Sequence, residues 1–489
     1  MGQLQANIKT IGELDFSLFD IPFYQRPYRW QPSHVETLLN CILESQNNKK
    51  EEYRIGSIII YRPAGSKKVE VVDGQQRLTT LSLLFMCIDE NTTFTLGCEF
   101  RNVESRRNIY INYRYIKNWL EYKGIDTEAM KDYILTKCSV VIIETDNLSE
   151  AFQMFDSQNG RGKELEAYNL LKAYHIRAID NEHNRISVTD EKIAIDRQWE
   201  QSVLMKSYGS DSSLLKTIIN ELFRIRQWSK SQRGYLFGKS RIKEFKGIQF
   251  SEGHSPLPLH NHSFLLYLVF RSSHDAIKEG LANRSFYNRH QQNPFVSINM
   301  DIINGSLFFS YVNTYVDSYN YLYKTEFREG DTLFQFKRDF EEFCINYEGA
   351  KRSGDSYIRA VYMALVIALY DRFGECYVAS YYKTLYNLAF RKRLESLSVF
   401  YDTVSKYPIP YFETIANAID ENGLESLRIA ASKDIDGRKL GKNEMAIAEF
   451  IVSNTPTVIV CNTSNVTVQG KILQQGVTIT KSSFSNGAE

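Results

Sequence analysis

Residues 69–81 read VEVVDGQQRLTTL, and the fold of the N-terminal part of the chain can be inferred from them. Val69–Asp73 is a β-branched run of the kind that forms buried strands. Apolar residues then recur at helical spacing through Leu78, Leu81 and Phe85, which predicts a helix directly after the strand. A strand that passes through a single glycine into a helix is typical of an α/β domain.

The turn between this strand and this helix is Asp73-Gly74-Gln75-Gln76-Arg77. Unpaired N–H groups at a helix N-terminus favour a phosphate, and Gly74 would let the backbone approach it closely. Arg77 would donate charge-assisted hydrogen bonds to phosphate oxygens. Asp73 would hold Mg²⁺ or position a water, and Gln75 or Gln76 would orient that water. On the alternative interpretation, Asp73 only caps the helix and Arg77 is its ion-pair partner.

Further elements of the same kind surround the turn. Arg54–Tyr61 and Cys138–Glu144 are predicted strands, and the segments 149–158 and 163–179 are predicted helices. We therefore expect an α/β domain over residues 1–175.

The rest of the chain is predicted to be different. Residues 176–430 form a large helical domain, in which Asp355–Phe373 and Cys376–Leu397 are the clearest helices and Gly374 is a C-cap between them. Residues 431–489 form a small β-rich segment that frays from about Ser482. Its expected strands are Pro456–Cys461, Asn465–Val468 and Gly476–Ile479. The fold class is thus α+β.

Two other segments carry candidate binding residues. Ile21–Trp30, IPFYQRPYRW, places Tyr24, Gln25, Arg26 and Trp30 around two prolines, and aromatic faces beside guanidinium groups suit base stacking and phosphate contact. On the alternative interpretation this is a packed turn, in which Tyr28 and Trp30 cover a helix.

The other segment is Phe152–Tyr174, which contains a turn signal at Asn159-Gly160 and polar groups at a helix start, among them Lys163. Taken alone, the segment is better explained as a plain corner between two helices.

Together the three segments resemble the GmrSD-type N-terminal domain, in its order and approximate spacing. The resemblance covers most of residues 10–410, and it implies a ParB-like domain from bacterial defence proteins of the modification-dependent restriction and phosphorothioate-sensing kinds. It implies hydrolysis of a nucleoside triphosphate, often GTP, at Asp73–Arg77, and DNA sensing at Tyr24, Gln25 and Arg26. It also implies that a second group of residues supports the nucleotide: Gly74, Thr80, Asn159, Gly160 and Lys163.

The chain departs from that family at its end. Complete members usually add an HNH nuclease domain, but histidine is absent after residue 410. His260-Asn261-His262 spells the motif contiguously, whereas an HNH site spreads its residues over a hairpin and a helix. We therefore expect no nuclease activity of this kind here, and a separately encoded nuclease or other effector as partner.

The charge pattern is compatible with a local basic surface that binds DNA. The net charge is +1, from 59 basic and 58 acidic residues, which argues against a DNA-coating protein. Arg224–Lys246, however, has eight cations against the single acid Glu244, with aromatic residues between them. Its candidate DNA contacts are Arg233, Lys239, Arg241 and Lys243. The alternative is an ordinary solvated face.

Cysteine usage and hydropathy indicate the compartment. The 7 cysteines stand singly, and no pair has the spacing of a zinc or redox motif. Met1–Leu14 has no leader-like pattern, and the chain has no apolar run of about 18 residues. We expect a cytoplasmic protein with no membrane segment and reduced thiols.

These observations favour a sensor that hydrolyses GTP or ATP with Mg²⁺ and recognises DNA, modified or not. A non-hydrolysing nucleotide- or DNA-binding switch that recruits a partner is the alternative from another class. A self-sufficient DNA endonuclease ranks last, because no cluster of carboxylates with a lysine stands out. The oligomeric state is open.

Overall fold

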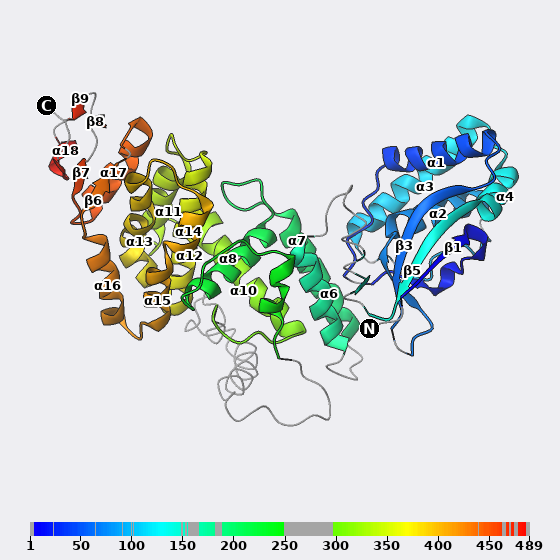
Figure 1. Cartoon of the computed structure of the whole chain (residues 1–489), viewed down its shortest axis with the longest axis horizontal. Coiled ribbons are helices and arrows are strands. Elements are labelled where there is room, and N and C mark those ends of the chain that lie inside the picture. The colour runs from blue at the N-terminus through cyan, green and yellow to red at the C-terminus, as the bar shows by residue number, and fades with distance from the viewer. Residues whose placement is uncertain are drawn as a thin grey trace, which may run out of the picture. The chain divides into compact units, whose positions relative to one another are not determined.

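The computed structural model divides into two compact units, Met1–Arg197 and Gln198–Glu489, and each is described by itself (Figure 1). The structure describes the following residues: 4–22, 24–63, 65–89, 91–98, 100, 102–147, 150–151, 154, 166–180, 188–248, 297–438, 440–461, 466–468, 471–473 and 478–485.

The first unit is built on a mixed sheet of five strands in the order β1-β5-β3-β4-β2. Strand β3 pairs in parallel with β5 and antiparallel with β4, while β1 runs antiparallel to β5 and β2 parallel to β4. The strands are β1 (Gln5–Thr10), β2 (Phe19–Asp20), β3 (Tyr53–Tyr61), β4 (Val69–Asp73) and β5 (Cys138–Thr145).

The central strand β3 is apolar at successive positions, so it presents apolar side chains on both faces of the sheet. Both faces are covered. Ile58 and Ile60 point into the larger core, which the helices α1 to α4 close on one side. Ile59 and Tyr61 point into a smaller core that contains Ala173. The helices are α1 (Pro32–Asn47), α2 (Gln75–Ile88), α3 (Val103–Lys123), α4 (Thr127–Lys137) and α6 (Ala167–Asp180), with short 3-10 turns at Ile11–Glu13 and Phe16–Leu18. The helix α7 (Val188–Leu204) contains the residues at which the chain passes from the first unit to the second.

The second unit is mostly helical, as expected. Its two longest helices are α12 (Ser353–Phe373) and α13 (Glu375–Glu395), and Gly374 between them has a φ of +82°. The predicted junction is therefore confirmed, and the positive φ explains why a glycine stands there. The other helices are α8 (Leu214–Trp228), η3 (Lys239–Phe245), α10 (Ser306–Lys324), α11 (Phe334–Phe340), the π-helical η5 (Glu341–Ile345), α14 (Tyr401–Lys406), α15 (Ile409–Asn417) and α16 (Glu421–Ala431).

The C-terminal segment has more structure than the expected strands. It forms a three-stranded sheet in the order β10-β7-β6 and a separate β8–β9 pair, and the helix α17 lies between β6 and β7 in sequence. The strands at Ile459–Cys461, Val466–Val468 and Thr478–Ile479 were predicted. The elements not predicted are β6 (Ile435–Gly437), α17 (Lys442–Asn454), β9 (Lys471–Leu473) and the short helix α18 (Ser482–Ser485).

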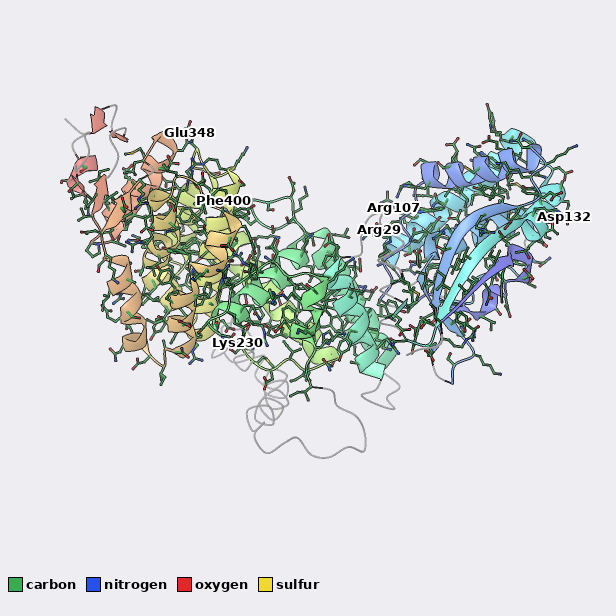
Figure 2. The ribbon with its side chains drawn as sticks, in the orientation of Figure 1. Arg29, Arg107, Asp132, Lys230, Glu348 and Phe400 are labelled. Carbon is green, nitrogen blue, oxygen red and sulfur yellow. The ribbon has the colours of Figure 1, made fainter. Side chains whose placement is uncertain are left out.

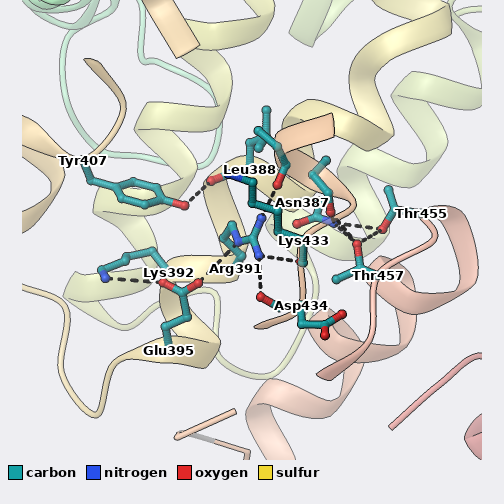
Figure 3. Close-up of polar contacts among 12 residues, drawn as sticks. Asn387, Leu388, Arg391, Lys392, Glu395, Tyr407, Lys433, Asp434, Thr455 and Thr457 are labelled. Atoms are coloured by element: carbon teal, nitrogen blue, oxygen red, sulfur yellow. Dashed lines mark hydrogen bonds and ion pairs between the residues drawn. The ribbon is translucent and has the colours of Figure 1, made fainter. Parts of the chain in front are cut away.

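Two polar side chains of α13 hold the C-terminal segment against the helices of the second unit (Figure 3). The Asn387 amide donates to the carbonyl of Ala431 at 2.9 Å and to the Thr457 hydroxyl at 2.8 Å. The Arg391 guanidinium donates to the carbonyl of Ala430 in the last turn of α16 at 2.6 Å and to that of Lys433, between α16 and β6, at 2.7 Å. These contacts explain why the end of the chain packs as part of the helical unit.

Among the described residues, we find no helix that is both long and apolar enough to cross a membrane.

Candidate functional site

The turn at Gly74 is set by backbone geometry. β4 ends at Asp73, α2 begins at Gln75, and Gly74 between them has a φ of +93°, which favours glycine. A Cβ at this position would lie 2.9 Å from Cγ1 of Ile58 on β3. The close approach that Gly74 permits is thus to the neighbouring strand, and it brings the start of α2 against the sheet.

The N-terminus of α2 has no side-chain cap. The N–H groups of Gln75, Gln76 and Arg77 donate none of the hydrogen bonds found among the described residues, and the first turn contains no acidic residue. By contrast, α3 is capped by the side chain of Asn102 and α4 by that of Asp126. The N–H groups at the start of α2 are therefore available to an anion.

Arg77 lies beside this N-terminus. Its Nη2 is 3.3 Å from Oδ2 of Asp73, and both side chains are about a fifth exposed, at 23% and 22%. A Cβ at Gly56 of β3, where φ is +144°, would lie 2.0 Å from Nη1 of Arg77, so the guanidinium crosses the strand at a glycine. The ion pair expected by the purely structural interpretation exists, but Gly74 rather than Asp73 occupies the capping position.

Gln75 is buried with an unsatisfied amide. The residue is 5% exposed, and its Oε1 accepts no hydrogen bond in the part of the chain that the structure describes. The hydroxyl of Thr79, one turn further along α2, is likewise buried without a partner. An enclosed polar atom without a partner costs about 1–3 kcal/mol, which a bound group could recover.

Gln76 has a different position. Its Oε1 accepts from the backbone N–H groups of Arg29 at 2.8 Å and Trp30 at 3.1 Å, and its Nε2 donates to the carbonyl of Pro27 at 3.3 Å. The amide is thus occupied in holding the segment before α1, and it is not placed to orient a water.

Thr80 lies in the core of the first unit. It is fully buried, and its hydroxyl is bonded to the carbonyl of Gln76 at 2.9 Å and to the hydroxyl of Tyr28 at 2.8 Å. Burial raises the pKa of Tyr28, so this phenol stays neutral. Thr80 is predicted from the sequence to support the nucleotide; in this structure its hydroxyl is enclosed and bonded within the first unit.

Tyr28 is held by polar residues on the inner face of α3. These residues were not identified from the sequence. Its N–H donates to the Ser105 hydroxyl at 2.9 Å, its carbonyl accepts from Asn108 at 2.8 Å, and its hydroxyl accepts from Asn112 at 3.0 Å. The signal was present, since these three residues recur at helical spacing. For Tyr28, the packed-turn interpretation is the one observed.

Tyr24 and Gln25 also face inward. Tyr24 is 5% exposed, its hydroxyl donates to Glu70 at 2.7 Å, and burial raises its pKa well above the usual value. Nε2 of Gln25 donates to the carbonyls of Val71 at 2.9 Å and Val72 at 2.7 Å. Both residues were expected to contact DNA, but in this structure they fasten their segment to β4 just before Asp73.

Arg26 and Trp30 differ from their neighbours. Arg26 is exposed at its surface and has no hydrogen bond or ion pair within the described chain. Surrounding protein atoms that displace part of its hydration, together with the charge of Arg29, lower its pKa, and Asp73 opposes them. Trp30 is partly buried and stacks on His34 with an interplanar angle of 18°. Arg26 is therefore a cation near Asp73 that is available to a ligand.

The third predicted segment cannot be placed: Asn159, Gly160 and Lys163 lie outside the described residues.

The basic stretch of the second unit is partly interior. Arg224 is 2% exposed, donates to Glu221 at 3.2 Å and lies over the ring of Trp228 at 4.4 Å. Arg226 is 8% exposed and donates to the carbonyls of Ile298 and Met300, each at 2.7 Å. These two cations therefore belong to the core.

The four cations chosen as DNA contacts lie further out. Arg233 pairs with Asp402 at 2.9 Å. Lys243 is exposed, whereas Lys239 and Arg241 are half-buried. The structure thus keeps these side chains at or near the surface, with Arg233 already paired.

Comparison with known families gives two matches along the chain. Residues 4–176 match the GmrSD restriction endonuclease N-terminal domain, and residues 191–444 match a family of unknown function, DUF7834. No curated protein matches the chain. The first match confirms the expected family of the N-terminal domain and places the chain in a restriction-related defence context. The chain belongs to the DUF7834 family, whose match covers more than half of it, and carries a GmrSD-type N-terminal domain.

Proposed function

We propose that this protein is a nucleotide-hydrolysing sensor of a phage-defence restriction system. It hydrolyses GTP or ATP at the N-terminus of α2, recognises DNA, modified or not, and acts with a separate nuclease. The observation that carries the proposal is the uncapped first turn of α2 with Arg77 beside it. Such a turn provides N–H donors and a positive dipole end for a phosphate chain.

Two arginines supply the positive charge. Arg77 exchanges its contact with Asp73 for a phosphate oxygen, and Arg26, which has no partner within the described chain, approaches from the segment before α1. Guanidinium groups bind phosphate through paired hydrogen bonds and stabilise the charge that develops as the terminal phosphoryl group leaves.

Asp73 fits the role of magnesium ligand. Among the described residues, no group of three or more histidine, cysteine or acidic side chains is gathered as a metal site. A nucleotide-bound Mg²⁺ needs only one or two carboxylates, because phosphate oxygens and waters complete its octahedron. Oδ2 of Asp73 meets Arg77, and Oδ1 makes no hydrogen bond within the described chain. The ion would neutralise phosphate charge there.

The water-orienting role falls to Gln75. Gln76 is engaged with three backbone groups of residues 27–30, whereas the amide oxygen of Gln75 has no partner. Because Gln75 is 5% exposed, its contact with a nucleotide requires the side chains that cover it to move.

The experiment is phosphate release from GTP and from ATP with Mg²⁺, in the presence and absence of modified DNA. Wild type should release phosphate, and Gln75→Ala should be slower by about 10²-fold, since an oriented donor or acceptor at a reacting group contributes on that order. Gln201→Ala, which removes an exposed amide from α7, is the matched control and should behave as wild type.

A second candidate, the non-hydrolysing switch, is favoured by one observation. Two residues that could act on water are constrained, Gln76 by its backbone contacts and Gln75 by burial. Nucleotide binding by wild type without phosphate release under any of these conditions would establish the switch and refute the hydrolase.

A further inference from the structure

The outward face of α3 carries a cluster that the site described above does not use. Its members are four cations and one tyrosine: Arg106, Arg107, Tyr110, Arg114 and Lys117. All five are exposed. Within the part of the chain that the structure describes, none of the four cations forms an ion pair. We call this set the α3 stripe.

Helical geometry places the α3 stripe on one side. With 3.6 residues per turn, the five positions fall within an arc of about 100°, and they extend over roughly 16 Å along the axis. That length corresponds to about five base pairs of duplex DNA, whose phosphates repeat every ~3.4 Å of axis along each strand.

The stripe contains an aromatic ring among its charges. Tyr110 is 62% exposed, and the guanidinium of Arg114 lies 5.8 Å from its ring centroid. An exposed tyrosine and cations without acidic partners contribute nothing to the core, but they can contact sugars, phosphates and bases.

The opposite face of α3 is fixed, so the stripe is presented on a rigid element. Ser105, Asn108 and Asn112 bind Tyr28 from the inner face, and Asn102 caps the helix. A rigid helix presents its side chains at low entropic cost on binding.

Nearby acids do not cancel the charge of the stripe. Glu104 in the first turn pairs with Arg29 at 3.3 Å, and Glu121 lies one turn beyond Lys117, where the stripe ends. Figure 2 labels Arg29, which pairs with Glu104, and Arg107, which belongs to the α3 stripe. The net charge of this face is positive although that of the whole chain is only +1.

We propose that the α3 stripe binds the phosphate backbone of duplex DNA. The inference rests on the proposed function, in which DNA is the recognised partner, and it names the surface that makes the contact. Since backbone contacts carry no sequence information, this surface binds DNA of any sequence and leaves recognition of a modification to other residues.

The test measures how the 489-residue chain binds a short labelled DNA duplex. Fluorescence anisotropy monitors the binding over a range of salt concentrations. The stripe variant carries Arg106→Gln, Arg107→Gln, Arg114→Gln and Lys117→Gln. Because each phosphate contact contributes about 0.9 to the slope of log K against log salt, the slope should fall by roughly 3–4, and binding should weaken at least tenfold.

The control removes the same number of charges from other exposed positions of the first unit: Lys9→Gln, Lys49→Gln, Lys50→Gln and Lys137→Gln. It should retain wild-type affinity and slope. Equal losses in both variants, unchanged binding by the stripe variant, or no duplex binding by wild type would each overturn the inference.

Phosphate release without DNA separates this inference from the proposed function. The stripe variant should hydrolyse nucleotide as wild type does and melt at the same temperature, because none of its residues contacts the α2 turn or the core. If wild type binds DNA through the stripe but releases no phosphate, the hydrolase proposal fails and the DNA surface stands.

Discussion

Two short segments of this protein are rich in polar and charged groups. In one segment several of these groups have no partner among the described residues, whereas in the other the first cations are bonded. In the turn Asp73–Arg77, the first N–H groups of α2 and the Gln75 oxygen have no partners in the described chain. In Arg224–Lys246, the first two cations are enclosed and bonded to Glu221 and to backbone carbonyls. A count of charges in the sequence does not separate these cases; their partners do.

The difference has a physical origin. A buried cation is costly unless neighbouring groups neutralise its charge, and Arg224 and Arg226 are bonded to Glu221 and to backbone carbonyls. One nitrogen of Arg224, Nη2, has no hydrogen-bond partner among the described residues. A ligand site, by contrast, contains polar groups whose hydrogen-bond partner is the ligand, and it tolerates a modest loss of folding stability while the ligand is absent.

The comparison predicts the largest effect on stability for Arg224→Ala. Removing this guanidinium leaves Glu221, which is 6% exposed, without its cation, and such losses cost about 3–5 kcal/mol. Chemical denaturation should show this loss in the free energy of unfolding of the second unit. Arg233→Ala, which removes an exposed partner of Asp402, should unfold as wild type does. Equal stability of the two variants would remove the distinction between the segments.

Arg77→Ala should affect turnover and not folding. Loss of one cation from the α2 turn should slow phosphate release by about 10²–10³-fold, equivalent to ~2.7–4 kcal/mol in the barrier. The melting temperature should change little, because the pair with Asp73 is partly exposed. The control is Arg54→Ala, because Arg54 lies on β3 and forms an exposed ion pair with Glu52. A variant that unfolds but keeps its activity per folded molecule would show that Arg77 is only structural.

Gly56→Ala tests whether the position of Arg77 matters. The new methyl group would occupy the place of Nη1 of Arg77 and would strain a residue with a φ of +144°, at a cost of about 1–3 kcal/mol. Phosphate release should fall as well. Gly65→Ala, where φ is +75° and nothing lies within 4 Å, introduces strain without displacing a side chain and should leave turnover intact. If both variants release phosphate equally well, the placement of Arg77 over β3 is irrelevant.

The smallest effect is expected for Thr80→Val. It removes two hydrogen bonds of a buried hydroxyl without creating a cavity, which should cost about 1–2 kcal/mol of stability. The KM for nucleotide should not change, since Thr80 is enclosed. Thr37→Val on the exposed side of α1 is the control for stability. A raised KM would restore Thr80 to the nucleotide site.

Part of this structure could be predicted from local sequence. β4, Gly74 and α2 follow from a β-branched run, a glycine and a helical period, and Gly374 follows from the same logic between α12 and α13. These signals lie within a few residues of the element they define.

The roles of individual side chains could not be predicted in this way. Gln76 reaches Arg29 and Trp30, more than forty positions earlier, and Trp228 donates to the carbonyl of Ser405. Such contacts depend on which elements the fold brings together. The α3 stripe is an intermediate case, because its spacing is local but its exposure depends on how α3 packs.

The most direct test of the central claim is hydrogen exchange, resolved by residue, at the start of α2 with and without GTP or ATP and Mg²⁺. The N–H groups of Gln75, Gln76 and Arg77 have no acceptor in the described chain, and their exchange should slow when a phosphate accepts from them. Ser105, at the capped start of α3, should not change. Nucleotide binding that leaves the three α2 groups unprotected would contradict a phosphate site at this turn.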